Sequence, residues 1–307
     1  MKALVSASTD SPRIAVAELD DPKPNTDQAL IEVAAISINR GEVKGLPGRD
    51  PSKPNGWDLA GVVKEPAADG TGPGKGARVV GMVFPQGAWA EFVAVPTVTL
   101  AELPDSVSFE DASTLPVAGM TALRALENAG FLVGERVAVT GASGGVGTFA
   151  IQLAKLGGAH VTAFARRQDG LAELGADVIE DRIGPEGEPF RAILDAVGGE
   201  ILGNAIQRVD PGGIVVSFAN TVQEPVTYPT RALFGGSPGA HVYGLMLFNE
   251  LRRNDNSGTR DLTRLVTLLA DGVLKTSIDL TLPFDQAQEA IDGLITGDVK
   301  GKAVLTL

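Results

Sequence analysis

The sequence predicts an α/β protein in two parts: a β-rich part, and a doubly wound parallel sheet with helices between its strands. Three observations support this prediction. A chain of 307 residues is long for a single hydrophobic core. Up to about residue 110 it reads as short strands between turns, and from about residue 111 helical and strand-like segments alternate. The composition, 44% hydrophobic and 21% charged, is typical of a globular protein.

Strand-like segments make up the first part, and clusters of Gly, Pro, Asp and Asn separate them. The expected strands are 2–7, 13–19, 28–39, 58–65, 77–84 and 88–95. The clusters DDPKPN and ADGTGPGKG between them are typical of turns.

In the second part, segment 111–130 reads as helical and is interrupted by Pro116. Buried strands are expected at 136–140, 160–165, 191–197, 213–219 and 241–247, with helices at 146–156 and 199–209. Strands that alternate with helices favour a parallel sheet.

The C-terminal segment holds a polar loop at 252–260, a helix at 261–272 and a final strand-like run, KAVLTL. It is too short to form its own core, so we expect it to return to the β-rich part. The expected domains are therefore 1–117 together with 249–307, and 118–248.

Charge and composition exclude several classes of partner and site. The net charge of −12 argues against a general basic surface for nucleic acid or anionic membrane. The sequence contains no Cys, which excludes disulfides and thiolate metal sites. No signal-peptide pattern and no membrane-spanning run is visible, so we expect a cytoplasmic protein.

The stretch VAVTGASGGVGTFAIQLAKLGGAHVTAFARR (137–167) reads as strand, glycine turn, helix and strand. Gly144, Gly145 and Gly147 have no Cβ, which allows a pyrophosphate to approach the backbone at the helix N-terminus. Ala142 stands in the first glycine place of the G-x-G-x-x-G pattern, so the match is incomplete. We predict dinucleotide binding; a tight turn with nothing bound is the alternative.

Arg166 and Arg167 follow the second strand of this unit, where an acid would bind the ribose 2′-OH of NADH. Guanidinium groups match the geometry of a 2′-phosphate, so the sequence favours NADPH. Two solvated arginines are the alternative, with Asp169 capping the next helix.

TGASGGVG also fits the glycine pattern of short-chain dehydrogenases, whose catalytic Tyr-x-x-x-Lys lies downstream. The tyrosines here are Tyr228 and Tyr243, and Ala232 and Leu247 stand four residues after them. That interpretation fails.

Phrases along the whole chain resemble the zinc-independent quinone oxidoreductase branch of the medium-chain dehydrogenase/reductase superfamily. They are GWDLAGVV (56–63), GARVVG (76–81), GAWAEFVAV (87–95), LPVAGMTALRAL (115–126), the glycine turn, LGAD (174–177), DAVGG (195–199), PGGIVVS (211–217) and GKAVL (301–305). The resemblance implies a GroES-like catalytic domain built from both chain ends around a Rossmann domain, with the active site in the cleft between them.

The resemblance also implies a site without zinc. Asn39 and Trp57 stand where zinc-using relatives carry a Cys and a His ligand. The sequence has two histidines, His160 and His241, which we expect to open strands and to be structural. Quinones and α,β-unsaturated carbonyls accept hydride without a Lewis acid, so we predict NADPH-dependent reduction of such small-molecule acceptors. A stand-alone enoyl or enone reductase of secondary metabolism, and an NADPH-binding protein with little turnover, are the alternatives.

The resemblance implies which residues of this chain correspond to the family's site residues, by their positions in the motifs. Asn39 and Glu42 are expected near the nicotinamide, and Thr121 beside it. The expected cofactor contacts are Thr121, Ser143, Gly144, Gly145, Val146, Arg166, Arg167, Ser217, Phe218, Ala219, Asn220, Tyr243, Gly244 and Leu245. Purely structural roles are the alternatives: a strand-ending turn for Asn39, a solvated charge for Glu42, a helix hydroxyl for Thr121 and a core aromatic for Tyr243.

Two further expectations follow from the resemblance. Segment 44–55, KGLPGRDPSKPN, is shorter than is usual in the family and lacks a tyrosine often found there, so the substrate pocket is expected to differ. The run HVYGLML is expected at the edge of the parallel sheet, where a second chain can pair with it to form a homodimer.

Overall fold

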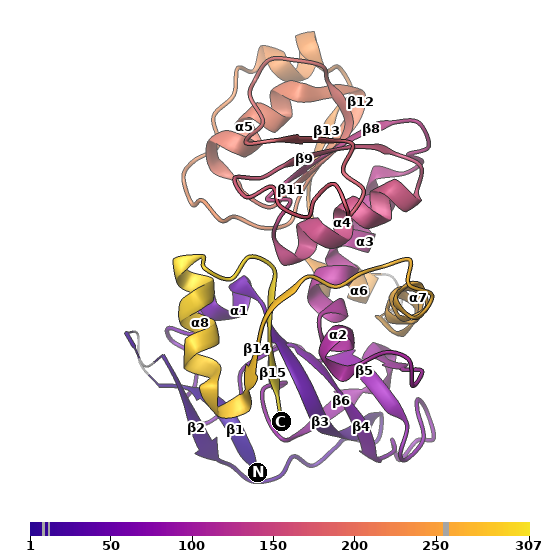
Figure 1. Cartoon of the computed structure of the whole chain (residues 1–307), viewed down its shortest axis with the longest axis vertical. Coiled ribbons are helices and arrows are strands. Elements are labelled where there is room, and N and C mark those ends of the chain that lie inside the picture. The colour runs from indigo at the N-terminus through magenta and orange to yellow at the C-terminus, as the bar shows by residue number, and fades with distance from the viewer. Residues whose placement is uncertain (8–9, 12, 254–257) are drawn as a thin grey trace. The chain divides into compact units, whose positions relative to one another are not determined.

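The computed structural model describes residues 1–7, 10–11, 13–253 and 258–307. The chain divides into two compact units (Figure 1). Unit 1 comprises Met1–Met120 and Leu251–Leu307, and unit 2 comprises Thr121–Glu250. The fold class is mixed α/β, which confirms the prediction.

Unit 1 is built on β-sheets with mostly antiparallel pairing. β1 (Lys2–Ser6) pairs with β2 (Ile14–Glu18). A larger sheet has the order β14-β15-β3-β4-β5-β7, and β6 also pairs with β3. These strands are β3 (Gln28–Ile38), β4 (Asp58–Glu65), β5 (Arg78–Met82), β6 (Phe92–Pro96), β7 (Leu100–Glu102), β14 (Ile278–Pro283) and β15 (Lys302–Thr306). Because β15 pairs with β3, the two ends of the chain share one sheet.

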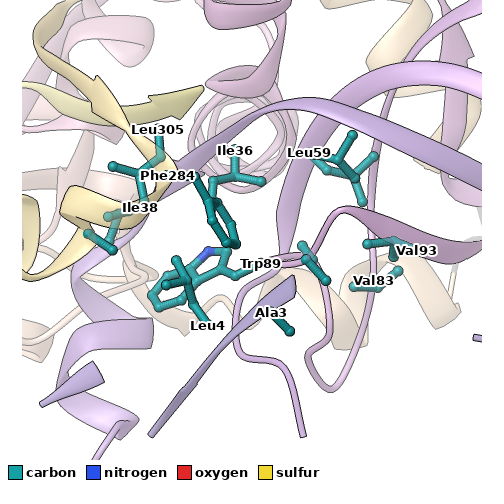
Figure 2. Packing of buried hydrophobic residues seen from close by; sticks show 14 of the residues in the cluster. Ala3, Leu4, Ile36, Ile38, Leu59, Val83, Trp89, Val93, Phe284 and Leu305 are labelled. Atoms are coloured by element: carbon teal, nitrogen blue, oxygen red, sulfur yellow. The ribbon is translucent and has the colours of Figure 1, made fainter. Parts of the chain in front are cut away.

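The core of unit 1 fills the space between these strands and helix α8 (Ala287–Thr296). Figure 2 shows Leu4, Trp89 and Phe284 lying together in this core, with Ile36 and Leu305 from β3 and β15 nearby. Residues far apart in the sequence therefore hold the ends of β3 and β15 in a fixed register, with Ile38 opposite Ala303. This register matters for the site described below.

Unit 2 contains a parallel sheet of order β10-β9-β8-β11-β12-β13. The strands are β8 (Arg136–Thr140), β9 (His160–Phe164), β10 (Val178–Glu180), β11 (Phe190–Asp195), β12 (Val209–Ser217) and β13 (His241–Gly244). Helices α3 (Met120–Ala129), α4 (Gly145–Leu156) and α5 (Gly199–Arg208) alternate with them. In such a sheet the strand order reverses between β8 and β11, and ligands bind near the strands' carboxyl ends at that point.

Four further helices lie in unit 1 or at its junction with unit 2 in the sequence. They are α1 (Arg40–Gly45), α2 (Phe109–Ser113), α6 (Leu247–Arg253) and α7 (Gly258–Ala270). None of the helices in the described ranges has the length and apolar character of a membrane span.

Several predicted boundaries are wrong for identifiable reasons. The helical segment expected over 111–130 begins earlier, at Phe109, but its predicted interruption at Pro116 is confirmed: a π-helical turn at Leu115–Gly119 separates α2 from α3, because Pro116 has no N–H for a regular helical bond. The strand expected at 88–95 begins only at Phe92. The strand expected at 213–219 ends at Ser217, and the one expected at 241–247 ends at Gly244, after which α6 begins.

Other local predictions differ in type. Turns follow Asp169 in place of the expected helix, so Asp169 does not cap one. Helix α1 and strands β7 and β10 were not expected, since each is too short for a periodic pattern. His160 and His241 open β9 and β13 as predicted. Residues 254–257 of the predicted polar loop lie outside the described residues.

Candidate active site

Helix α1 begins directly after β3, and Asn39 lies at the junction. The Asn39 N–H donates to Glu42 Oε2 at 2.5 Å, and the Trp57 N–H donates to Glu42 Oε1 at 2.6 Å. Glu42 is only 2% exposed, so the alternative of a solvated charge is wrong. Its carboxyl group ties the start of α1 to the residue that precedes β4.

The side-chain amide of Asn39 lies between an acid and a base. Its Nδ2 donates to Asp58 Oδ2 at 2.7 Å, and its Oδ1 accepts from Lys302 Nζ at 2.7 Å. Among the described residues, only Asp58 accepts a hydrogen bond from Nδ2, so the second Nδ2 hydrogen is unused there, and Asn39 is half-buried. Asn39 follows the last residue of β3, as its purely structural role required, and it also presents an oriented side-chain amide.

Asp58 and Lys302 form the buried base of this cluster, at 0% and 3% exposure. Asp58 Oδ2 also accepts from Ser37 Oγ at 2.9 Å, and its Oδ1 accepts from the Val117 N–H at 3.0 Å. Lys302 Nζ lies 3.5 Å from Asp58 Oδ2. Each buried charge thus has a partner of opposite sign, which buried ions require.

Burial shifts the ionisation of all three charged groups. The pKa of Glu42 is raised to about 8, chiefly by burial and also by the negative charge of Asp58, while Lys302 opposes the shift. Burial also raises the pKa of Asp58 and lowers that of Lys302. At neutral pH, Glu42 therefore holds a proton, and Asp58 and Lys302 lie at ion-pair distance from each other.

Trp57 occupies the other position that the resemblance assigns to a metal ligand. Its Nε1 donates to the Pro85 carbonyl at 2.7 Å, and its ring lies against Gly41. Within the described residues, no group of three His, Cys, Asp or Glu side chains is placed to hold a metal ion. The Asn39 oxygen already accepts from an ammonium group, which repels a cation. The donor set therefore does not fit a catalytic zinc.

The sequence indicated Asn39 and Glu42, which lie together, but not Asp58, Lys302 or Ser37. A weak signal existed for two of these. Asp58 directly follows Trp57, and Lys302 is a charged residue at the start of the otherwise apolar run KAVLTL.

In unit 2, the glycine turn lies at the carboxyl end of β8. Gly144 precedes α4 without a side-chain cap, so the first N–H groups of this helix are available to an anion. A Cβ on Gly147 would lie 2.6 Å from the carbonyl oxygens of Gly141 and Ala142, so this position accepts only glycine. Ser143 to Val146 are half-exposed. These features fit the pyrophosphate of a dinucleotide.

The carboxyl ends of β8, β11 and β12 meet around Asp195. Asp195 accepts from Thr140 Oγ1 at 2.7 Å, from the Gly198 N–H at 3.1 Å and from Ser217 Oγ at 3.4 Å. Burial raises its pKa. The sequence did not single out Asp195, although it is the acid of the DAVGG phrase.

The other predicted cofactor residues lie at the ends of β12 and β13, in the segments that follow β9, β12 and β13, or at the start of α3. Ser217 stands opposite Gly244, and the Leu245 N–H donates to the Ser217 carbonyl at 2.8 Å, so these three lie together. The Tyr243 hydroxyl donates to Glu250. Phe218 is half-buried, Ala219, Asn220, Arg166 and Arg167 are exposed, and Thr121 is buried at the start of α3.

Comparisons with known proteins identify the family of the chain. A family profile described as alcohol dehydrogenase GroES-like domain matches residues 25–105, and one described as zinc-binding dehydrogenase matches residues 155–305. A chloroplastic quinone oxidoreductase of Triphysaria versicolor is 32% identical over 94% of this chain and 92% of its own. A 2-methylene-furan-3-one reductase of Solanum lycopersicum is 31% identical over 92% of this chain and 73% of its own. The solved quinone oxidoreductase from Coxiella burnetii superimposes with a TM-score of 0.83 at 28% identity, covering 100% of this chain and 99% of its own.

Proposed function

Because the chain belongs to the quinone oxidoreductase branch of the medium-chain dehydrogenase/reductase superfamily, we propose that it reduces a quinone or another α,β-unsaturated carbonyl with NADPH and without a metal ion. That the chain is an oxidoreductase follows from its family. The choice of acceptor, the choice of cofactor and the absence of a metal are our proposals.

The observation that carries the proposal is the Asn39 amide held between Asp58 and Lys302. When hydride adds to a conjugated carbon, electron density moves to the carbonyl oxygen, and a fixed N–H donor stabilises that charge. The remaining Nδ2 hydrogen of Asn39 is such a donor, and the proton that completes the product comes from solvent. A conjugated acceptor needs no stronger Lewis acid.

Bound NADPH would supply the hydride. We propose that the backbone of Ser143–Val146 binds its pyrophosphate and that Arg166 and Arg167 bind its 2′-phosphate. The other expected contacts, at Thr121, at Ser217–Asn220 and at Tyr243–Leu245, orient the ribose and nicotinamide. The protein then acts chiefly by holding cofactor and acceptor in register.

The second candidate function is that of a stand-alone enone or enoyl reductase that does not reduce quinones, which the similarity to a 2-methylene-furan-3-one reductase favours. NADPH oxidation should be followed with 1,4-benzoquinone, with an enone and with an enoyl thioester. Turnover with the quinone supports the first candidate, and turnover with only the enone or thioester supports the second. Tight NADPH binding without turnover across the whole panel would contradict both and indicate a binding protein.

The remaining parts of the proposal concern location and assembly. We propose a homodimer that forms along β13, since this strand is at the edge of the sheet and Val242 on it is 46% exposed. The cytoplasmic location remains a prediction from the sequence.

A further inference from the structure

Strand β15 begins with a lysine whose charge is almost completely removed from water. Burial of an ammonium group is unfavourable unless it is paired and hydrogen-bonded. Lys302 Nζ meets this requirement by donating to Asn39 Oδ1 at 2.7 Å, and it lies 3.5 Å from Asp58 Oδ2. Its nearest neutral partner is therefore a residue of the candidate active site.

The two charged partners allow the Asn39 amide only one orientation. An ammonium group can only donate hydrogen bonds, so it requires the amide oxygen; an ionised carboxylate can only accept, so it requires the amide nitrogen. A rotation of the amide by half a turn would place Nδ2 against Lys302 and Oδ1 against Asp58. Both contacts would then be repulsive.

The same contacts make the amide a better donor. A cation at the carbonyl oxygen polarises the amide, and hydrogen bonds in a connected chain strengthen one another. The second Nδ2 hydrogen, which has no acceptor among the described residues, becomes a stronger donor through this polarisation. Asp58 is in turn held by Ser37 and by the Val117 N–H, so the carboxylate that accepts from Asn39 Nδ2 is also fixed.

We propose that Lys302 and Asp58 are positioning residues that lock Asn39 so that its second Nδ2 hydrogen is presented to the oxygen of the hydride acceptor. The proposal rests on the proposed reduction of a conjugated carbonyl. Lys302 touches neither acceptor nor cofactor in this role, and its effect passes through Asn39.

A double-mutant cycle in the full-length protein tests this coupling. The variants are Lys302→Met, Asn39→Ala and the two combined, with 1,4-benzoquinone as the acceptor probe. Loss of an oxyanion donor lowers kcat by about a hundredfold or more in other enzymes, so we expect Lys302→Met to lower kcat by roughly tenfold to a hundredfold. The KM for NADPH should stay within about twofold, since the substitution removes no contact with the cofactor. The double variant should be no slower than Asn39→Ala alone.

Two further variants separate positioning from folding. Lys300→Met removes an exposed lysine two positions away, and it should leave kcat, KM and Tm unchanged. Lys302→Arg keeps the charge and donor, and it should recover part of the lost kcat. Additive losses in the double variant, or an unchanged kcat in a folded Lys302→Met, would overturn the proposal.

A measurement without any acceptor keeps this result separate from the proposed function. The protein is labelled with ¹⁵N-asparagine, and the side-chain amide of Asn39 is assigned as the signal missing in Asn39→Ala. Its hydrogens should exchange with solvent faster in Lys302→Met than in wild type or Lys300→Met. Unchanged exchange refutes the positioning role. Faster exchange in an enzyme that reduces no acceptor supports the locked amide and refutes the proposed reaction instead.

Discussion

Glu42 lies in the first turn of a short helix, where glutamate is commonly exposed, and yet its carboxyl group is buried beside a second acid. Both of its oxygens accept backbone N–H groups, from Asn39 and Trp57. Burial nevertheless dominates and raises its pKa to about 8. The groups that face it are Asp58 on β4 and Lys302 on β15, and one proton on Glu42 brings this cluster to zero net charge.

This shift predicts how stability depends on pH. The folded protein holds the Glu42 proton up to about pH 8, whereas the unfolded chain releases it near the usual glutamate pKa of 4.5. Between these values the folded state binds more protons, so stability falls as pH rises through this window. Each unit of pKa shift is worth about 1.4 kcal/mol, so the loss is on the order of a few kcal/mol.

We expect the Tm of the wild type to fall more steeply between about pH 5.5 and 8.5 than that of Glu42→Gln, whose amide does not titrate. The measurement is thermal unfolding across this pH range. Glu32→Gln, which changes an exposed glutamate on β3, is the matched control and should keep the wild-type slope. Parallel Tm curves for wild type and Glu42→Gln would show that Glu42 is ionised in the folded protein.

Arg166 and Arg167 are exposed after the end of β9, where a 2′-phosphate would be bound. A charge-assisted hydrogen bond contributes about 1.5–3 kcal/mol. Replacing both arginines with Ala should therefore weaken the binding of NADPH by about 3 kcal/mol, or more than about a hundredfold. NADH lacks this phosphate, and its KM should barely change.

Steady-state kinetics with both cofactors checks this prediction. The effect should be on KM and not on kcat, because the phosphate is remote from the hydride and binds ground and transition states equally. Arg182→Ala, at another exposed arginine near the end of β10, should behave as wild type. Equal wild-type use of NADH and NADPH, or equal losses for both in the variant, would refute a role in cofactor choice.

At the scale of elements, the turn from β8 into α4 depends on a close backbone approach. Gly147 is buried, and a side chain there would contact two carbonyl oxygens at 2.6 Å. Gly147→Ala should therefore push α4 away from β8, lower stability by about 1–3 kcal/mol and weaken NADPH binding. The control is Gly74→Ala, since a Cβ at Gly74 would meet nothing within 4 Å.

Thermal unfolding and NADPH titration by fluorescence measure the two effects of Gly147→Ala. Both should change in Gly147→Ala and neither in Gly74→Ala. A Gly147→Ala protein that binds NADPH as tightly as the wild type would show that the turn does not contact the cofactor.

The edge strands of the parallel sheet allow a matched test of assembly. Val242 on β13 is 46% exposed and Val178 on β10, at the opposite edge, is 39% exposed. If β13 pairs with β13 of a second copy, Val242→Lys should place charge in that interface and give a monomer, while Val178→Lys remains a dimer. Light scattering at micromolar concentration distinguishes these states. A wild-type monomer would contradict the proposed dimer.

At the scale of the whole molecule, the proposed chemistry requires that no metal takes part. The Asn39 amide between Asp58 and Lys302, and Trp57 bonded to the Pro85 carbonyl, leave no tetrahedral donor set at this place. Elemental analysis should find no stoichiometric zinc, and EDTA should leave NADPH oxidation unchanged. One tightly bound zinc per chain, with activity lost on chelation, would refute the metal-free site.

Local features were predictable wherever neighbouring residues determine them. The glycine turn and helix α4 were identified from spacing alone, because the apolar period and the glycines lie within one short segment. The strands of unit 2 other than the short β10 were located, but the ends of β12 and β13 were placed beyond Ser217 and Gly244, because hydrophobic residues continue past the point where pairing stops. Asn39 and Glu42 were identified by motif position through the family resemblance, since they lie three residues apart.

The sequence by itself determined the fold class, the glycine turn before α4 and the candidate residues Asn39 and Glu42, since each is encoded in short runs of residues. Only the tertiary structure decided what Asn39 and Glu42 can do. Lys302 is 263 residues from Asn39 along the chain, and it reaches the amide because β15 pairs with β3. Burial raises the pKa of Glu42, and burial depends on how distant strands pack against one another.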